Sequence, residues 1–159
     1  MEDAERRTLR TIADYQFRAG AGVALFPDGE SYEVDRSKSG RPRQVSTTDG
    51  ERLVSLGTDG RFTLGLAGGR RLETALEPPA CRVVVGDESE PFVREGKNVF
   101  AKFVSEVDPL LRPGDEVVVV HADGSLLAVG RAELDAEAVR DFDVGTAVKV
   151  REGAGPGDA

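Results

Sequence analysis

A proline pair in the middle of the chain limits what this sequence can fold into. Glu77-Pro78-Pro79 interrupts helices and strands alike, because proline fixes its own φ angle and lacks a backbone N–H donor. The chain has 159 residues, so a boundary here leaves two segments of about 80 residues, each the size of a small domain. We therefore expect domains at residues 1–79 and 80–153. The segment 154–159 has no core-forming residue and is expected to be a disordered tail.

The composition is that of a folded chain without a targeting segment. Apolar residues make up 39% of the sequence, which is enough for a core, and no apolar run approaches the roughly 20 residues of a membrane helix. The N-terminal residues MEDAERRTLR lack the apolar region of a signal peptide. Cys81 is the single cysteine, so an internal disulfide is excluded. The expected location is cytoplasmic, with no membrane partner.

The charge is unusual in amount and in kind. The formal net charge is −8, and only four of the 21 basic residues are lysines. Residues 1–79 hold 13 acidic and 12 basic residues, and residues 80–159 hold 16 and 9, so the second half carries −7. This pattern is typical of a halophilic proteome, although a GC-rich coding bias would also replace lysine by arginine. In concentrated salt the Debye length falls to about 3 Å, so binding there rests on close contacts.

The first half indicates an α+β domain. A stripe of apolar residues predicts a helix over residues 3–17, and residues 21–26 predict one more helical turn. Short apolar runs predict strands throughout residues 31–76, with turns at Asp49-Gly50 and Asp59-Gly60.

The second half indicates a compact β-barrel with two short helices. The valine run Val117–Val120 is typical of a strand buried on both faces. Three further strands are predicted at residues 82–85, 126–132 and 146–151, and short helices at residues 88–94 and 136–142.

The stretch PFVREGKNVFAKFV, residues 91–104, is the first candidate binding element. Gly96 breaks the chain before a predicted strand over residues 99–104, Lys97 and Asn98 lie at the break, and Lys102 lies on the strand. Such a glycine-hinged loop could hold a polyanion, although a plain turn with solvated lysines has the same pattern. Two further elements supply cations: Lys149 and Arg151 share a face of the last strand by their spacing, and Arg140 lies on the preceding helix.

A second candidate element is the loop RSKSGRPR, residues 36–43. It carries four positive charges and no negative charge in an acid-rich chain. The contact residues expected here are Lys38, Arg41 and Arg43. A charged loop is often simply solvated, and that interpretation also remains open.

Nothing in the sequence predicts a catalytic centre, a metal site or a cofactor. His121 is the single histidine and is expected to be structural or on the surface, and Cys81 is expected to be a small buried residue. The pair Gly68-Gly69, followed by Arg70-Arg71, is interpreted as a turn rather than a cofactor loop. Phosphate-loop and hydrolase motifs are absent from the sequence.

Four blocks in order carry a family resemblance. PFVREGKNVFAKFV, PGDEVVVV, LLAVGRAEL and GTAVKVREG together resemble the PUA domain over residues 82–153. The segments IADYQFRAGAGVALFP and RSKSGRPRQV are similar to the domain that precedes the PUA domain in archaeal tRNA-guanine (archaeosine) transglycosylases. The resemblance implies an α+β fold, with a small N-terminal α+β domain followed by a PUA-type mixed β-barrel with short helices. It also implies a tRNA-binding region without the catalytic barrel.

The resemblance favours a non-catalytic RNA-binding protein that binds the stem and 3′ end of tRNA in support of tRNA modification such as archaeosine formation. A separately encoded tRNA-guanine transglycosylase or another archaeosine-pathway enzyme is the candidate protein partner. By analogy, Gly96, Lys97, Asn98 and Lys102 match the glycine-loop surface, and Lys149 and Arg151 match the terminal strand. The alternative is a protein-interaction module that keeps the PUA fold and has lost RNA binding, which the acidic second half favours. An enzyme with an unrecognised site is a third hypothesis.

Overall fold

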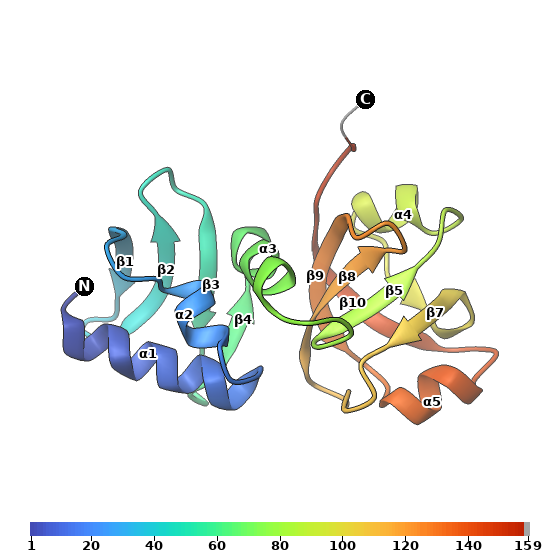
Figure 1. Ribbon diagram of the computed structural model, residues 1–159, viewed down its shortest axis with the longest axis horizontal. Coiled ribbons are helices and arrows are strands. Elements are labelled where there is room, and N and C mark those ends of the chain that lie inside the picture. Colours follow the sequence, from blue (N-terminus) through green and yellow to red (C-terminus); the bar gives the residue numbers. More distant parts are fainter. Residues whose placement is uncertain (158–159) are drawn as a thin grey trace. The chain divides into compact units, whose positions relative to one another are not determined.

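Residues 1–157 are described by a computed structural model, and the chain divides into two compact units (Figure 1). The first unit ends at Leu76 and the second begins at Glu77. None of the described helices is both long enough and apolar enough to cross a bilayer.

The first unit is an α+β fold built on a four-stranded antiparallel sheet, whose strands pair in sequence order. Its elements are α1 (Asp3–Gln16), α2 (Ala21–Leu25), β1 (Tyr32–Arg36), β2 (Pro42–Thr47), β3 (Arg52–Leu56), β4 (Phe62–Leu64) and α3 (Leu66–Ala75). The predicted turns are confirmed, because Gly50 and Gly60 have positive φ angles, at 86° and 79°, between paired strands.

Helix α1 confirms the amphipathic pattern in the sequence. Leu9 and Ala13 are buried, and Asp3 and Glu5 lie in the first turn, where the helix dipole favours negative charge. The helix runs along one end of the sheet, beside the β1–β2 and β3–β4 turns (Figure 1).

Helix α3 corrects two expectations. Residues 66–75 were expected to belong to strands, with a turn at Gly68-Gly69, but they form a helix. The glycines serve close packing: a Cβ atom on Gly68 would lie 2.0 Å from the Leu53 carbonyl oxygen on β3. The helix is thus pressed against the sheet at a distance that only glycine permits, and a glycine pair alone does not distinguish this from a turn.

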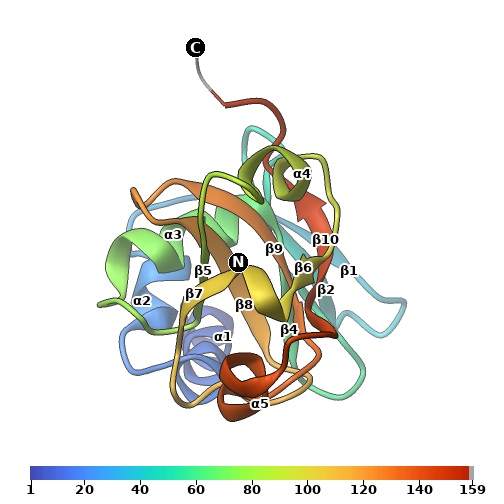
Figure 2. The ribbon, with the colours of Figure 1, turned by 90° about the vertical axis from the view of Figure 1, so that its right-hand side faces the viewer.

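The second unit is a six-stranded mixed sheet that curves into a nearly closed barrel (Figure 2). Its elements are β5 (Arg82–Val85), α4 (Glu90–Arg94), β6 (Val99–Phe100), the 3-10 helix η1 (Ala101–Phe103), β7 (Val104–Val107), β8 (Glu116–His121), β9 (Leu126–Ala132), α5 (Ala136–Asp141) and β10 (Thr146–Gly153). The strand order is β6-β10-β9-β8-β5-β7; β5 and β8 pair in parallel, and the other pairs are antiparallel. Helices α4 and α5 lie at opposite ends of the barrel (Figure 2).

The core of the barrel is aliphatic. The four valines of β8 are all buried, which confirms the expectation from the valine run. The other core residues come from every strand and both helices, among them Val83, Val93, Val99, Val107, Leu127, Val139 and Val148.

The stretch 91–104 differs from the continuous strand that its spacing predicted. The predicted strand placed Val99, Ala101 and Phe103 on one face; Val99 and Ala101 are buried, but Phe103 is 37% exposed, and η1 interrupts the chain between β6 and β7. Strands β6 and β7 are the two edge strands of the barrel sheet. The chain therefore passes from one edge of the sheet to the other through η1.

The last strand is longer than predicted and reaches Gly153. The start of the expected tail is hydrogen-bonded: Ala154 N–H donates to the Leu127 carbonyl at 2.8 Å, and Gly155 N–H donates to the Arg94 carbonyl at 2.9 Å. Residues 158 and 159 of that expected tail lie outside the described residues.

Candidate nucleic-acid interface

Gly96 ends helix α4 in the left-handed conformation. Its φ angle is +98°, and the N–H groups of Gly96 and Lys97 donate to carbonyls of the last helical turn at 2.9 and 3.0 Å. No atom lies within 4 Å of the position where a Cβ would be. Gly96 is therefore required by backbone conformation, and the space above it is open to a ligand.

The loop after α4 is fastened to the terminal strand β10. The side-chain oxygen of Asn98 accepts a hydrogen bond from Val150 N–H at 3.0 Å. A Cβ on Gly153 would lie 2.3 Å from the Arg94 carbonyl oxygen and 2.8 Å from Gly96 N. The structure thus brings together two elements that the sequence could only propose separately, and it gives Asn98 a positioning role.

A groove of about 530 Å³ opens beside this loop. Its lining is rich in exposed phenylalanine: Phe92 is 59% exposed and Phe100 is 50% exposed. The described lining residues are Glu88, Ser89, Phe92, Val93, Lys97, Asn98, Phe100 and Phe103. This volume falls within the range of small-ligand pockets, and the exposed aromatic rings offer stacking faces. We refer to it below as the phenylalanine groove.

Sequence reasoning missed these phenylalanines. Phe92 was placed in a predicted short helix, Phe100 and Phe103 were placed in a predicted strand, and none of the three was named as a contact residue. Phe92 lies on α4, Phe100 on β6 and Phe103 on η1, and the residues that these elements bury are Val93, Val99 and Ala101. The predicted contact Lys102 lies at the same edge, with its Nζ 5.1 Å from the Phe103 ring centroid, as in a cation–π contact.

The two cations of the terminal strand β10 differ in their surroundings. Lys149 is exposed, and Arg151 lies two residues further along. However, the Arg151 guanidinium is hydrogen-bonded at 2.5 Å to the carboxylate of Glu116, which is buried in the barrel. Since a buried carboxylate is costly without a partner, Arg151 serves the fold as well as the surface.

Strand register adds a cation that the sequence did not indicate. Arg131 on β9 pairs with Lys149 on β10, so the two side chains lie on the same face of the sheet. Arg131 is 53% exposed and forms an ion pair with Glu133 at 3.2 Å. Arg140, by contrast, lies in the last turn of α5, and α5 is at the opposite end of the barrel from α4 (Figure 2).

The loop of residues 36–43 in the first unit carries two cations that hydrogen-bond within the fold and two that are exposed. Arg36 holds Glu5 through two hydrogen bonds of 2.8 Å, and these lower the pKa of the Glu5 carboxyl. Arg41 donates to the Gly57 carbonyl at 3.2 Å. Lys38 and Arg43 remain exposed at the surface. Half of the positive charge that made this loop conspicuous therefore stabilises the fold.

His121 and Cys81 have structural surroundings. His121 Nε2 is 2.6 Å from an Asp87 carboxylate oxygen, and Asp123 N–H donates to Nδ1 at 3.0 Å. The hydrogen bond with Asp87 raises the pKa of His121. Cys81 is buried, as expected. Among residues 1–157, no group of three or more potential metal-binding side chains is found.

Comparison with known families divides the chain within a few residues of the boundary between the two structural units. Residues 7–79 match the model of the patch-forming domain C2 of tRNA-guanine transglycosylase, and residues 81–154 match the PUA domain.

Archaeal relatives match nearly the whole chain. It is 46% identical over 152 residues to the tRNA-guanine(15) transglycosylase of Pyrococcus abyssi, which is 95% of this chain and 25% of that protein. It is 44% identical over 153 residues to the protein of that name from Methanothermobacter thermautotrophicus, which is 96% of this chain and 23% of that protein. The chain thus spans about a quarter of the length of these relatives.

Solved structures support the same fold. A conserved PUA domain protein from Thermoplasma acidophilum aligns with a TM-score of 0.65 at 24% identity, covering 99% of this chain and 93% of that chain. A PUA domain protein from Aeropyrum pernix aligns with a TM-score of 0.68 at 20% identity, covering 98% and 85%.

Proposed function

We propose that this chain, which joins a C2 domain of the tRNA-guanine transglycosylase family to a PUA domain, binds tRNA through its second unit. The observation that best supports this proposal is that the Gly96 loop, the phenylalanine groove and the terminal strand adjoin one another. Asn98 links the loop to that strand directly. A surface that combines an open backbone, aromatic faces and lysines suits RNA, which is recognised by shape, phosphates and unpaired bases.

Two parts of the surface suit two parts of a tRNA. Lys149 and Arg131 lie side by side on neighbouring strands and can contact phosphates of a duplex stem. The phenylalanine groove can receive unpaired nucleotides, because bases stack on exposed aromatic rings whatever their sequence. In this proposal the stem lies on the strands and the unpaired 3′ end enters the groove, with Lys97 beside its phosphates.

The proposed role is binding rather than catalysis. The two matched domains are the C2 and PUA regions. The chain would supply a tRNA-binding surface in support of a modification such as archaeosine formation. Its candidate partner is a tRNA-guanine transglycosylase or another enzyme of that pathway.

The first experiment measures binding of tRNA by fluorescence anisotropy at several salt concentrations. We expect tighter binding of intact tRNA than of tRNA trimmed of its unpaired 3′ nucleotides. Phe100→Ala should weaken binding of intact tRNA about 5- to 150-fold, the range for one stacked base. Equal affinity for tRNA and for an unrelated folded RNA of similar size would refute the proposal.

The acidic second half, residues 80–159 with a net charge of −7, favours a second candidate function as a protein-interaction module. Lys97→Glu and Arg112→Glu separate the two, because both residues are exposed and each change alters the charge equally, but only Lys97 lines the groove. For an RNA-binding surface, Lys97→Glu weakens binding and lowers the slope of log K against log salt by about 1, and Arg112→Glu does neither. RNA affinity that is the same in both variants and in the unaltered chain would favour the interaction module.

A further inference from the structure

His121, the single histidine of the chain, is hydrogen-bonded to the loop that forms one wall of the phenylalanine groove. Its Nε2 is 2.6 Å from a carboxylate oxygen of Asp87, which lies in the loop between β5 and α4. The next two residues of that loop, Glu88 and Ser89, line the groove. The contact with Asp87 therefore joins the end of β8 to a wall of the groove.

The backbone fixes both ends of this short loop. Strands β5 and β8 pair in parallel, and their register ends with Val85 opposite His121. The Gly86 carbonyl then accepts a hydrogen bond from Ser89 N–H at 3.2 Å. Asp87 lies between these two anchored points, so its side chain is placed where a change at His121 is passed to the groove wall.

The hydrogen bonds of the imidazole show where its proton lies. Asp123 N–H donates to Nδ1 at 3.0 Å, so Nδ1 of neutral His121 is an acceptor and the ring proton is on Nε2, which donates to Asp87. Protonation adds a hydrogen to Nδ1, and a carboxylate oxygen of Asp123, 3.1 Å away, can accept it. The ring then carries a positive charge between two carboxylates, and its bond to Asp87 becomes charge-assisted at both partners.

Carboxylates approach His121 from each neighbouring element. Asp87 lies on the β5–α4 loop, Asp123 on the β8–β9 turn and Glu90 on α4, and together they raise the pKa of His121. The hydrogen bond with Asp87 is the largest cause, and the partial burial of the ring opposes it. The charged form of His121 is thus favoured by the same contact that reaches the groove wall.

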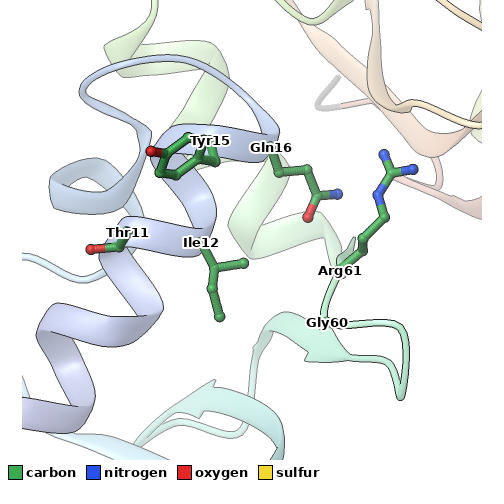
Figure 3. Close-up of a pocket in the computed structure, with 6 residues that line it drawn as sticks. All are labelled: Thr11, Ile12, Tyr15, Gln16, Gly60 and Arg61. Atoms are coloured by element: carbon green, nitrogen blue, oxygen red, sulfur yellow. The ribbon is translucent and has the colours of Figure 1, made fainter.

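The groove of the first unit differs in this respect. It lies between α1 and the β3–β4 turn and has a volume of about 440 Å³ (Figure 3). Its described lining contains neither a histidine nor a carboxylate. A proton gained or lost near neutral pH is therefore not expected to act there, and this groove supplies a control.

We infer that His121 is a positioning residue for the phenylalanine groove: its imidazolium holds Asp87, and through it the adjoining groove wall, in the arrangement that binds unpaired RNA. This inference rests on the proposed function, because it assigns a proton-dependent control to the groove proposed to receive the 3′ end. Loss of the proton weakens the bond to Asp87 and loosens the wall. The affinity for tRNA is then highest while His121 is protonated, and falls as the pH rises through its pKa.

A positive charge near the groove would also attract RNA directly, and Asp87→Ala separates the two causes. This variant leaves the imidazole able to titrate but removes its link to the groove wall. If His121 acts through Asp87, the pH dependence of binding disappears in Asp87→Ala. Direct attraction would leave the pH dependence in place.

The test measures tRNA binding by fluorescence anisotropy between about pH 5.5 and about pH 9. We expect the affinity to fall about 2- to 5-fold across the titration of His121, a small factor because the Asp87 side chain is 95% exposed. In Asp87→Ala and in His121→Gln the affinity should not change with pH. Asp123→Asn removes a carboxylate that contacts His121 from the other side, so it should lower the midpoint and keep the fall. Tyr15→Ala, in the groove of Figure 3, should leave the whole profile unchanged.

A second measurement needs no RNA. Because the chain has one histidine, its imidazole C–H signals in an NMR spectrum are assigned without a variant. The amide signal of Ser89 should titrate with the same midpoint as His121, and Asp87→Ala should remove this coupling. By linkage, bound tRNA should raise the pKa of His121 further.

The outcomes distinguish this inference from the proposed function. If tRNA binds but the fall with pH persists in Asp87→Ala, or if the unaltered chain shows no fall, the inference is wrong and the proposed function stands. A Ser89 amide that does not follow the titration of His121 would overturn the positioning role alone. If tRNA binds at no pH, the proposed function fails and this inference fails with it.

Discussion

Replacing Gly153 by alanine should disturb the proposed RNA-binding loop through its backbone, without altering any side chain proposed to contact RNA. A Cβ at this position would lie 2.3 Å from the Arg94 carbonyl oxygen and 2.8 Å from Gly96 N. Both neighbours are backbone atoms, so no flexible side chain can move aside. The end of β10 or the chain from Arg94 to Gly96 must move by about 1 Å to restore an ordinary contact distance.

The stability that Gly153→Ala would lose can be estimated from the overpacking of other fitted sites. Overpacking a fitted site typically costs about 1–3 kcal/mol. For a domain of this size that corresponds to a fall in melting temperature of about 4–24 °C. Because Gly96 and Asn98 position the groove, we expect the same displacement to weaken tRNA binding at temperatures where the variant is still folded.

The assay pairs a melting curve, followed by circular dichroism, with tRNA anisotropy at 25 °C. Gly86→Ala is the matched control, since no atom lies within 4 Å of its Cβ position and its φ angle is ordinary. A Gly153→Ala variant that melts with the Gly86→Ala control and binds tRNA as tightly would show that the loop does not depend on this contact.

Three further expectations concern single interactions in the second unit. Asn98→Ala removes the acceptor for Val150 N–H and should lower the free energy of unfolding in urea by about 1 kcal/mol, whereas Asn98→Asp, which keeps an acceptor, should not. Asp135 caps α5, and Asp135→Ala should cost about 1 kcal/mol in the same assay; no loss would mean that the cap is dispensable. The Asp87 hydrogen bond raises the pKa of His121, so its contribution to stability is complete below pH 6.5 and is lost as pH rises through the raised value. His121→Gln should therefore remove this pH dependence from the melting temperature, and an unchanged profile would contradict the assignment.

Local patterns in the sequence predicted much of the fold because their causes are local. The stripe on α1 needs only helical periodicity, and the Gly50 and Gly60 turns need only a residue that tolerates positive φ. The valine run predicts a strand with both faces buried whatever its neighbours are. These elements were recognisable because each follows from residues that are close in sequence.

Elements set by distant partners were harder to predict. Gly68 looks like a turn residue until Leu53, fifteen positions earlier, is seen to press against it. The pairing of Arg131 with Lys149 depends on the register of β9 and β10, which a bulge after Val150 shifts again. A one-residue change in register would move either cation to the other face, so the sequence alone could not join them.

Only part of the candidate site could be predicted from the sequence, because the prediction relied on charge. Basic residues were chosen from the sequence because they stand out in an acidic chain, yet Arg36, Arg41 and Arg151 each bind a carboxylate or a carbonyl of the fold itself. The features that best fit RNA are instead rings and open backbone, which formal charge does not reveal. Stacking and close backbone approach lose little strength when salt screens long-range attraction. In the proposed function, recognition of RNA through phenylalanine faces would therefore keep its affinity where a basic patch would lose it, and the acidity of the second unit would not argue against an RNA partner.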